Sequence, residues 1–180
     1  LNSGTYGNIN RSTYSWWRSQ VTNVAGALAL TGASGIRRMY NDCSNGKGRM
    51  TPNLIMTTQI LYEGFEALMD TNMRFGKGDT GPAINGFNLK YKNADVVYDE
   101  ECQSGRMYFL NSKTLHLVVH PSRDGGSVTD NEEGDKGHFR VSPFKEPPDQ
   151  DAMIANAMWM GNTTCSNPRF NGVLTGLTNS

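Results

Sequence analysis

Residues 51–69 constrain the fold more than any other stretch, because they predict a buried strand that runs directly into a helix. Pro52 lacks an amide N–H and cannot lie inside a helix, and the apolar run 54–56 after it has the length of a buried strand. Thr57 or Thr58 can then cap a helix with its hydroxyl. The helix presents one apolar stripe, formed by Leu61, Phe65, Leu68 and Met69. This strand–helix unit is structural, and nothing in it indicates chemistry.

A second helix is predicted over residues 34–44, followed by a series of short strands. Four residues recur there at helical spacing: Ile36, Met39, Tyr40 and Cys43. Ser34 is the expected N-cap, and Asn45 with Gly46 supplies the stop. The predicted strands are residues 87–91, 96–98, 106–110 and 114–120. This order predicts an α+β fold with a sheet meander that the two helices cover.

Other stretches read as connections or as a separate arm. Residues 1–13 and the glycine-rich stretch 74–82 are predicted loops. Residues 122–138 carry one aliphatic side chain and are expected to be an exposed, mobile loop. From residue 152 to 177 the pattern predicts a long extended hairpin arm, a second subdomain.

Charge is balanced over the whole chain but not along it. Lysine plus arginine equal aspartate plus glutamate at 17 each, so no overall field attracts nucleic acid or membrane. Residues 1–50 hold six basic residues against one acidic, whereas residues 121–151 hold eight acidic against four basic. Two solvated faces explain this distribution, and so do complementary contact surfaces in an assembly.

Trp16, Trp17, Arg11 and Arg18 are the candidate subunit-contact residues. Adjacent tryptophans cannot both face one core, because neighbouring positions diverge on a strand or a helix. One ring is expected in the core and the other against a neighbour, within the chain or from another subunit. The two arginines belong to the basic region around them.

The sequence predicts no catalytic residue, no metal ligand and no cofactor. The three cysteines are far apart with no C-x-x-C pair, which favours reduced thiols, and no catalytic or nucleotide motif is present. His116 and His120 lie about 13 Å apart on an extended strand, too far to chelate one metal ion alone. The acidic run 99–101 beside Cys102 has no histidine nearby in sequence to complete a nucleophile–base pair. No stretch approaches the ~20 apolar residues of a membrane span.

An ordered set of segments resembles the major capsid proteins of tailed bacteriophages, whose shell fold is named after a Hong Kong coliphage. No single motif is diagnostic, but the order of the segments is specific. They are residues 6–18, 52–62, 86–102, 104–111, 115–121, 149–152, 159–169 and 172–174.

The resemblance implies a shell subunit with an axial and a peripheral domain. Residues 1–29 would enter the peripheral domain, residues 30–140 would form the axial domain, a sheet with flanking helices, and residues 141–180 would return as long antiparallel strands. The family's N-terminal arm, extended loop and spine helix would precede Leu1. Function would then be association into an icosahedral capsid around double-stranded DNA, not catalysis.

The implied partners are identical subunits, with scaffolding, portal or decoration proteins as further ones. Packaged DNA would be contacted non-specifically at most, and no membrane is involved. The location would be the virion, after assembly in the host cytoplasm. Two alternatives stay open: a cellular cargo-enclosing shell of the same fold, and an enzyme or ligand-binding domain whose site forms only in three dimensions.

Overall fold

The computed structural model describes residues 3–45, 50–72, 89–119, 140–148 and 151–178, and it contains two helices and short strands. The helices are α1 (Ile36–Asp42) and α2 (Gln59–Asn72), with 3-10 turns η1 (Ser15–Trp17), η2 (Ser112–Thr114) and η4 (Pro168–Phe170). The strands are β1 (Thr5–Tyr6), β2 (Ile9–Asn10), β3 (Gln20–Ala27), β4 (Leu54–Thr57), β5 (Leu89–Tyr91), β6 (Ala94–Tyr98), β7 (Met107–Leu110), β8 (Leu115–Val119), β9 (Arg140–Val141), β10 (Ala157–Met158), β11 (Gly161–Cys165) and β12 (Gly172–Thr178).

The described part of the chain forms two compact units, residues 1–114 with 166–180, and residues 115–165. The predicted boundaries after residues 29 and 140 do not coincide with these units, because β3 and β12 pair in the same sheet as β4, β5, β6 and β7. The assignment of the parts to axial and peripheral domains stays a prediction.

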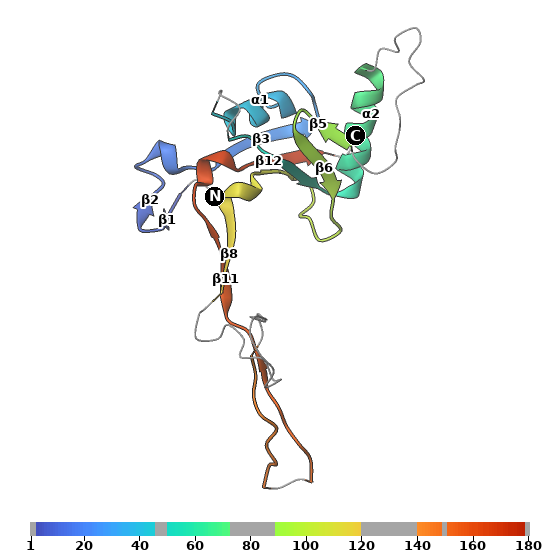
Figure 1. Cartoon of the computed structure of the whole chain (residues 1–180). Coiled ribbons are helices and arrows are strands. Elements are labelled where there is room, and N and C mark those ends of the chain that lie inside the picture. The colour runs from blue at the N-terminus through green and yellow to red at the C-terminus, as the bar shows by residue number, and fades with distance from the viewer. Residues whose placement is uncertain (1–2, 46–49, 73–88, 120–139, 149–150, 179–180) are drawn as a thin grey trace. The chain divides into compact units, whose positions relative to one another are not determined.

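The first unit is built on a mixed six-stranded sheet in the order β3-β12-β7-β4-β6-β5 (Figure 1). β12 runs parallel to β3, and β4 runs parallel to β6, while the other pairs are antiparallel. The predicted meander is therefore wrong. Turn residues signal where strands end, but they do not say which strands pair. Here β4, which precedes α2 in the chain, lies between β6 and β7, so these two consecutive strands are not neighbours.

Both helices pack on one face of this sheet. Tyr91 of β5 contacts the ring of Tyr40 from α1 (5.7 Å between centroids) and the ring of Phe65 from α2 (6.2 Å). Successive side chains of a strand point to opposite faces of the sheet, and residues opposite each other on neighbouring strands share a face. Ile55 of β4 lies opposite both Val96 of β6 and Phe109 of β7. The buried cluster comprises Ile36, Met39, Tyr40, Cys43, Ile55, Leu61, Phe65, Ala94, Val96, Met107, Phe109, Leu174 and Leu177.

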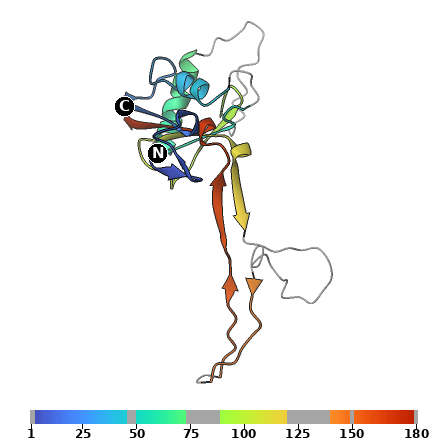
Figure 2. The same cartoon turned by 90° about the vertical axis from the view of Figure 1, so that its left-hand side faces the viewer.

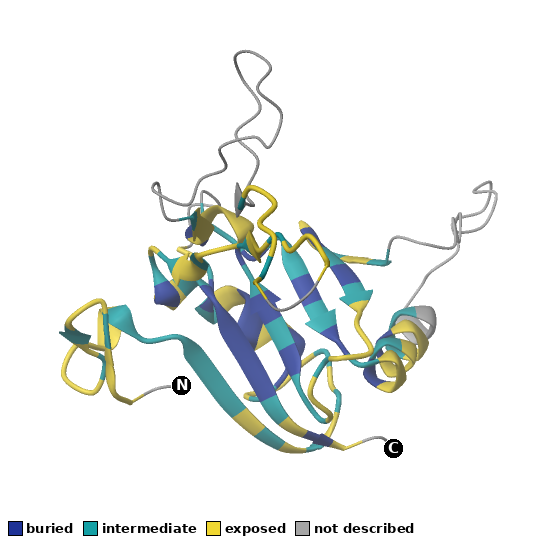
Figure 3. Ribbon diagram, turned by 90° about the horizontal axis from the view of Figure 1, so that it is seen from below, coloured by how far each residue is buried: buried dark blue, intermediate teal, exposed yellow. Residues whose placement is uncertain are grey.

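Buried residues concentrate on the central strands and thin out toward the edge strand β3 (Figure 3). Gln20, Val21 and Thr22 of β3 are half-buried, and from Thr22 on half-buried and exposed positions alternate. The two valines of β3 stand among polar and small residues, so no apolar pattern predicts this strand. The predicted strand before a helix is confirmed as β4 and α2, with Leu61 and Phe65 buried. Each of these two side chains contributes about 1.5–3 kcal/mol by leaving water.

Two local predictions need correction. Gly35, in an extended conformation, is the N-cap of α1 in place of Ser34, and it makes no side-chain cap hydrogen bond. A Cβ on Gly35 would lie 2.5 Å from the carbonyl oxygen of Thr31. The turn before the helix is therefore too close for any residue with a Cβ, and glycine fits. Thr114 lies in the η2 turn, and strand β8 begins one residue later.

The predicted loop at residues 1–13 contains a small hairpin of β1 and β2. Gly7 and Asn8 have φ of 59° and 62°, the conformation of a type I′ turn between paired strands. The predicted connections at 74–82 and 122–138, and the helix stop at Gly46, lie outside the described residues.

The second unit is an antiparallel ribbon in which β11 pairs with β8 and β10 pairs with β9 (Figures 1 and 2). Lys145 and Ile154 form a further antiparallel bridge. The predicted hairpin arm, residues 152–177, is thus confirmed as far as Cys165, the end of β11. Its last part is not in the arm, because β12 joins the central sheet of the first unit.

Candidate subunit-contact surface

Trp17 is anchored inside the N-terminal segment, whereas Trp16 presents its ring to the outside. The Trp17 indole N–H donates to the Tyr6 carbonyl oxygen at 3.0 Å, and its ring stacks on Tyr6 with centroids 6.4 Å apart. Trp16 meets Trp17 edge-on at 5.7 Å and Tyr14 at 5.8 Å, and 53% of Trp16 is exposed. The prediction that one of the two rings lies in the core is wrong, because Trp17 is only half-buried and neither ring belongs to the buried cluster.

Arg18 is hydrogen-bonded to the backbone of the turn that precedes η1. Its guanidinium donates to the backbone carbonyl oxygens of Arg11 and Ser12, and the Arg11 N–H donates to the Gly4 carbonyl oxygen at 3.0 Å. The Arg18 charge is thus used within the chain, where it satisfies carbonyl groups of the turn before η1. Whether Trp16, Trp17, Arg11 and Arg18 contact another subunit stays a prediction.

A polar groove of about 510 Å³ lies beside this segment, between η1, the start of β3, the end of α1 and η4. We call it the arginine groove. Its lining residues are Ser15, Arg18, Ser19, Gln20, Val21, Arg38, Asn41, Asp42, Ser44 and Arg169. Three arginines stand against one aspartate, an excess of two positive charges.

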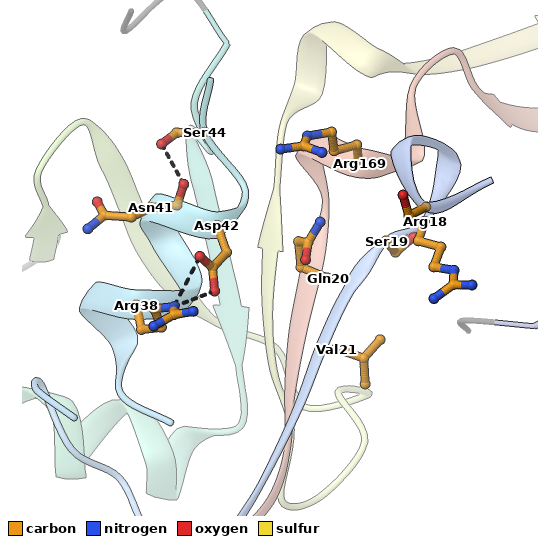
Figure 4. Close-up of a pocket in the computed structure, with 10 residues that line it drawn as sticks. Arg18, Ser19, Gln20, Val21, Arg38, Asn41, Asp42, Ser44 and Arg169 are labelled. Atoms are coloured by element: carbon orange, nitrogen blue, oxygen red, sulfur yellow. Dashed lines mark hydrogen bonds and ion pairs between the residues drawn. The ribbon is translucent and has the colours of Figure 1, made fainter. Parts of the chain in front are cut away.

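The arginines of this groove have different roles (Figure 4). Arg38 donates to both carboxylate oxygens of Asp42, at 3.1 and 2.9 Å, so this pair is neutralised. Arg18 points away from the groove, whereas the Arg169 side chain extends from η4 toward the side that carries Asn41 and Asp42. Among the described residues the structure shows no hydrogen bond or ion pair for the Arg169 guanidinium, so its charge is available to a partner.

Arg169 is not among the contact residues that the sequence predicts. η4 places it, with Pro168 at the start of the turn and the Asn167 side-chain oxygen accepting from the Arg169 N–H at 3.2 Å. Asn-Pro signals such a turn locally. The groove itself needs the parallel pairing of β3 with β12, which brings residues about 150 positions apart together, with Gly172 opposite Gln20.

Exposed apolar side chains gather in the second unit, which we call the apolar ribbon (residues 115–165). The structure exposes these large apolar residues there: Leu115, Leu117, Val118, Phe144, Met153, Ile154, Trp159 and Met160. Two strands alone cannot bury such side chains, and an isolated two-stranded ribbon is marginally stable in water. Large exposed apolar patches mark interaction surfaces.

Chemistry-bearing groups do not converge in the described parts of the chain. No cluster of three or more histidine, cysteine or acidic residues positioned for a metal ion is found among the described residues. His116 is exposed on β8 opposite Thr164, and His120 lies outside the described residues. Burial raises the pKa of the Cys43 thiol to about 12, with the nearby Asp42 charge adding to the effect, so this thiol is inert. Within the described ranges, no helix has the length and apolar character needed to cross a membrane.

Two solved shell structures share the arrangement of this chain. The capsid asymmetric unit of cyanophage A-1(L) matches with a TM-score of 0.64 and 17% identity, covering 97% of this chain and 56% of that one. The holo-SrpI encapsulin complex from Synechococcus elongatus matches with a TM-score of 0.56 and 9% identity, covering 89% and 54%. No protein-family model and no curated protein matches the sequence.

The chain therefore has the α+β shell fold that tailed-phage capsid proteins and encapsulins share, as the resemblance implied. It spans a little over half the length of each matched chain.

Proposed function

We propose that this chain is part of a structural subunit that assembles with copies of itself into an icosahedral bacteriophage capsid. The observation that carries the proposal is the extent of the fold match, which covers 97% of the chain in the cyanophage capsid structure. The match to the encapsulin is weaker in both TM-score and coverage. This difference favours a viral capsid over a cellular shell.

The apolar ribbon supports association as the function. Its exposed side chains, Trp159 and Leu117 among them, contribute to stability only when a neighbouring surface removes them from water. Each contact in a closed shell can be weak, because one subunit has many neighbours and the contacts combine through effective concentration. Scaffolding, portal or decoration proteins are further partners under this proposal, and DNA is enclosed without sequence-specific contacts.

The alternative of an enzyme or ligand-binding domain has less support. Small-molecule sites are mostly apolar with a few polar groups, whereas the arginine groove is lined almost entirely by polar and charged residues. We therefore propose that the protein is not an enzyme and that its place is the virion, after assembly in the host cytoplasm.

Microscopy of the purified full-length protein tests the proposal. Negative staining, combined with sedimentation velocity over a concentration series, is expected to show rings or closed particles. A protein that stays monomeric at every concentration, with or without a scaffolding protein, is not a shell subunit.

The contents of particles isolated from producing cells separate the two kinds of shell. Nuclease-protected double-stranded DNA inside the particles is expected for a capsid. Particles that hold protein cargo and no nucleic acid would instead identify a cellular shell, the function that the encapsulin match favours.

A further inference from the structure

The arginine groove contains a positive charge that the described part of the chain does not neutralise. Arg38 is paired with Asp42, and Arg18 is bonded to backbone carbonyl groups, which leaves Arg169 as the cation directed into the groove (Figure 4). A guanidinium of this kind fits a carboxylate, which accepts its hydrogen bonds and carries the opposite charge.

An exposed group of carboxylates occurs on the same compact unit, in the turn after β6. Asp99, Glu100 and Glu101 are all exposed, and we call these residues the acidic turn. Three hydrogen bonds fix its backbone: the Asp99 N–H donates to Thr57 O at 2.9 Å, the Glu101 N–H to the Asp99 carboxylate at 2.9 Å, and the Cys102 N–H to Asp99 O at 3.1 Å. The side chains of Glu100 and Glu101 thus project from a turn whose shape is already set. Little ordering entropy is lost when such a turn binds.

The acidic turn and the arginine groove lie at opposite ends of strand β12. The groove includes Gln20, which pairs with Gly172 at the start of β12. The connection after the acidic turn meets the other end, where the Leu177 N–H donates to Gly105 O at 3.0 Å. At about 3.3 Å per residue, the stretch from Gly172 to Leu177 spans roughly 17 Å. One copy of the chain therefore cannot bring its own turn and groove into contact.

We propose that the acidic turn of one copy binds in the arginine groove of the next copy, with Glu100 or Glu101 on Arg169. This inference rests on the proposed function, since it names one contact through which the shell subunits associate. Two different surfaces meet in this contact, so it is heterologous, and heterologous contacts close into rings when the rotation between copies permits. The acidic turn and the groove together define the direction of such a ring.

A nucleic acid fits the groove less well. Duplex DNA carries a phosphate charge about every 1.7 Å along its axis, and proteins that bind it match this spacing with several cations. Among its lining residues the groove instead offers the single cation Arg169, because Arg38 is paired with Asp42 and Arg18 points away. One or two carboxylates on a rigid turn match this charge pattern, whereas a continuous line of phosphates does not.

Charge reversal on each side of the contact, and on both together, tests the proposal in the full-length protein. Arg169→Glu reverses the groove, and Glu100→Lys with Glu101→Lys reverses the turn. Each change is expected to raise the concentration of half-assembly by about tenfold or more, because repulsion replaces attraction. The triple variant is expected to return to within about threefold of the parent protein, as for two sites in direct contact. Sedimentation velocity measures assembly, and circular dichroism checks the fold.

Matched controls carry the same reversals elsewhere. Arg37→Glu changes an exposed arginine of α1 outside the groove, and Glu63→Lys with Glu66→Lys changes two exposed acids of α2. Both are expected to assemble like the parent protein. The groove–turn contact is refuted if Arg169→Glu and the turn variant also assemble like the parent, or if the triple variant shows no recovery, while the shell function stands.

A short DNA duplex serves as a second probe of the groove. Loss of duplex binding in Arg169→Glu, together with unchanged assembly, would assign the groove to phosphate and overturn the proposal. A parent protein that never assembles would reject the shell function and this contact together.

Discussion

Replacing Gly172 with alanine is a direct test of how closely helix α1 packs on strand β12. A Cβ built on Gly172 would lie 2.5 Å from the Cys43 sulfur, 2.8 Å from the Met39 sulfur and 3.1 Å from the Gln20 carbonyl oxygen. Favourable contacts between heavy atoms lie at about 3.5–4.0 Å. The added methyl group therefore overlaps the Cys43 sulfur by about 1 Å.

The structure offers little room to relieve this overlap. Cys43 and Met39 are at most 1% exposed, and their sulfur atoms already touch at 3.7 Å. The Gln20 oxygen belongs to the backbone of β3. Overpacking of this kind costs about 1–3 kcal/mol. In a chain of this size each kcal/mol lowers the Tm by about 2–4 °C, so a cost of about 2 kcal/mol lowers it by roughly 4–8 °C.

Gly64→Ala is the matched control, because it makes the same chemical change at an open position. Gly64 lies in the exposed part of α2, and a Cβ there would meet nothing within 4 Å. Alanine in a helix interior is favoured over glycine by about 0.5–1 kcal/mol. Thermal and urea unfolding of the two variants are therefore expected to shift in opposite directions from the parent protein.

A double-mutant cycle identifies the atom responsible. Cys43→Ala removes the nearest sulfur, so the double variant with Gly172→Ala is expected to lose less free energy of unfolding than the two single changes together, by about 0.5–3 kcal/mol. Equal stabilities of Gly172→Ala and Gly64→Ala would refute the close packing of α1 on β12. Strict additivity would show that Cys43 is not the obstacle.

Three further predictions concern single side chains. Trp17→Ala is expected to lower the free energy of unfolding by about 1–3 kcal/mol, because the contacts of this ring are lost. Trp16→Ala is expected to change the free energy of unfolding by no more than about 0.5 kcal/mol but to impair assembly measured by sedimentation. A double alanine variant that forms normal shells would contradict the contact role. Asn171→Ala is expected to cost about 1–3 kcal/mol in thermal unfolding, because the buried Asn111 N–H loses its acceptor at 2.9 Å; an unchanged Tm would contradict this. The raised pKa of Cys43 predicts that this thiol resists labelling at pH 8 until denaturant is added, and rapid labelling of all three thiols in the folded protein would refute this. The stability that the raised pKa contributes is complete below the ordinary pKa of 9.0 and is lost as the pH rises toward about 12. Cys43→Ala is expected to remove this fall in the free energy of unfolding with pH.

Local patterns in the sequence were sufficient to predict the elements whose burial follows a simple period. The spacing of Ile36, Met39 and Tyr40 predicted α1, and the run after Pro52 predicted β4 and the start of α2. These predictions succeed because side chains three or four positions apart share one face of a helix, whatever the rest of the chain does. The Gly7-Asn8 hairpin was also within reach, since a glycine–asparagine pair between two β-prone residues is a recognised turn signal.

The order of segments along the chain, compared with a known family, led to the capsid fold, and the fold match confirms it. Composition and periodicity alone ended at an α+β building block without an evident site. The contact roles of Trp16, Trp17, Arg11 and Arg18 remain untested. For Arg18 the structure adds a use that sequence could not show, since its bonds to the Arg11 and Ser12 carbonyl groups depend on the bend of that turn.

Only the tertiary structure decided which strands are neighbours, and with that where the arginine groove lies. β3 and β12 are separated by most of the chain, yet they pair in parallel along their length. Strand pairing depends on long-range contacts whose partners carry no local signal of each other, because backbone hydrogen bonds are the same for every sequence. Pairing β12 with β3 brings Arg169 beside the end of α1, and it sets the acidic turn at the far end of the same strand. The sequence determined the charges themselves, and the folded chain determined that they can meet only between copies.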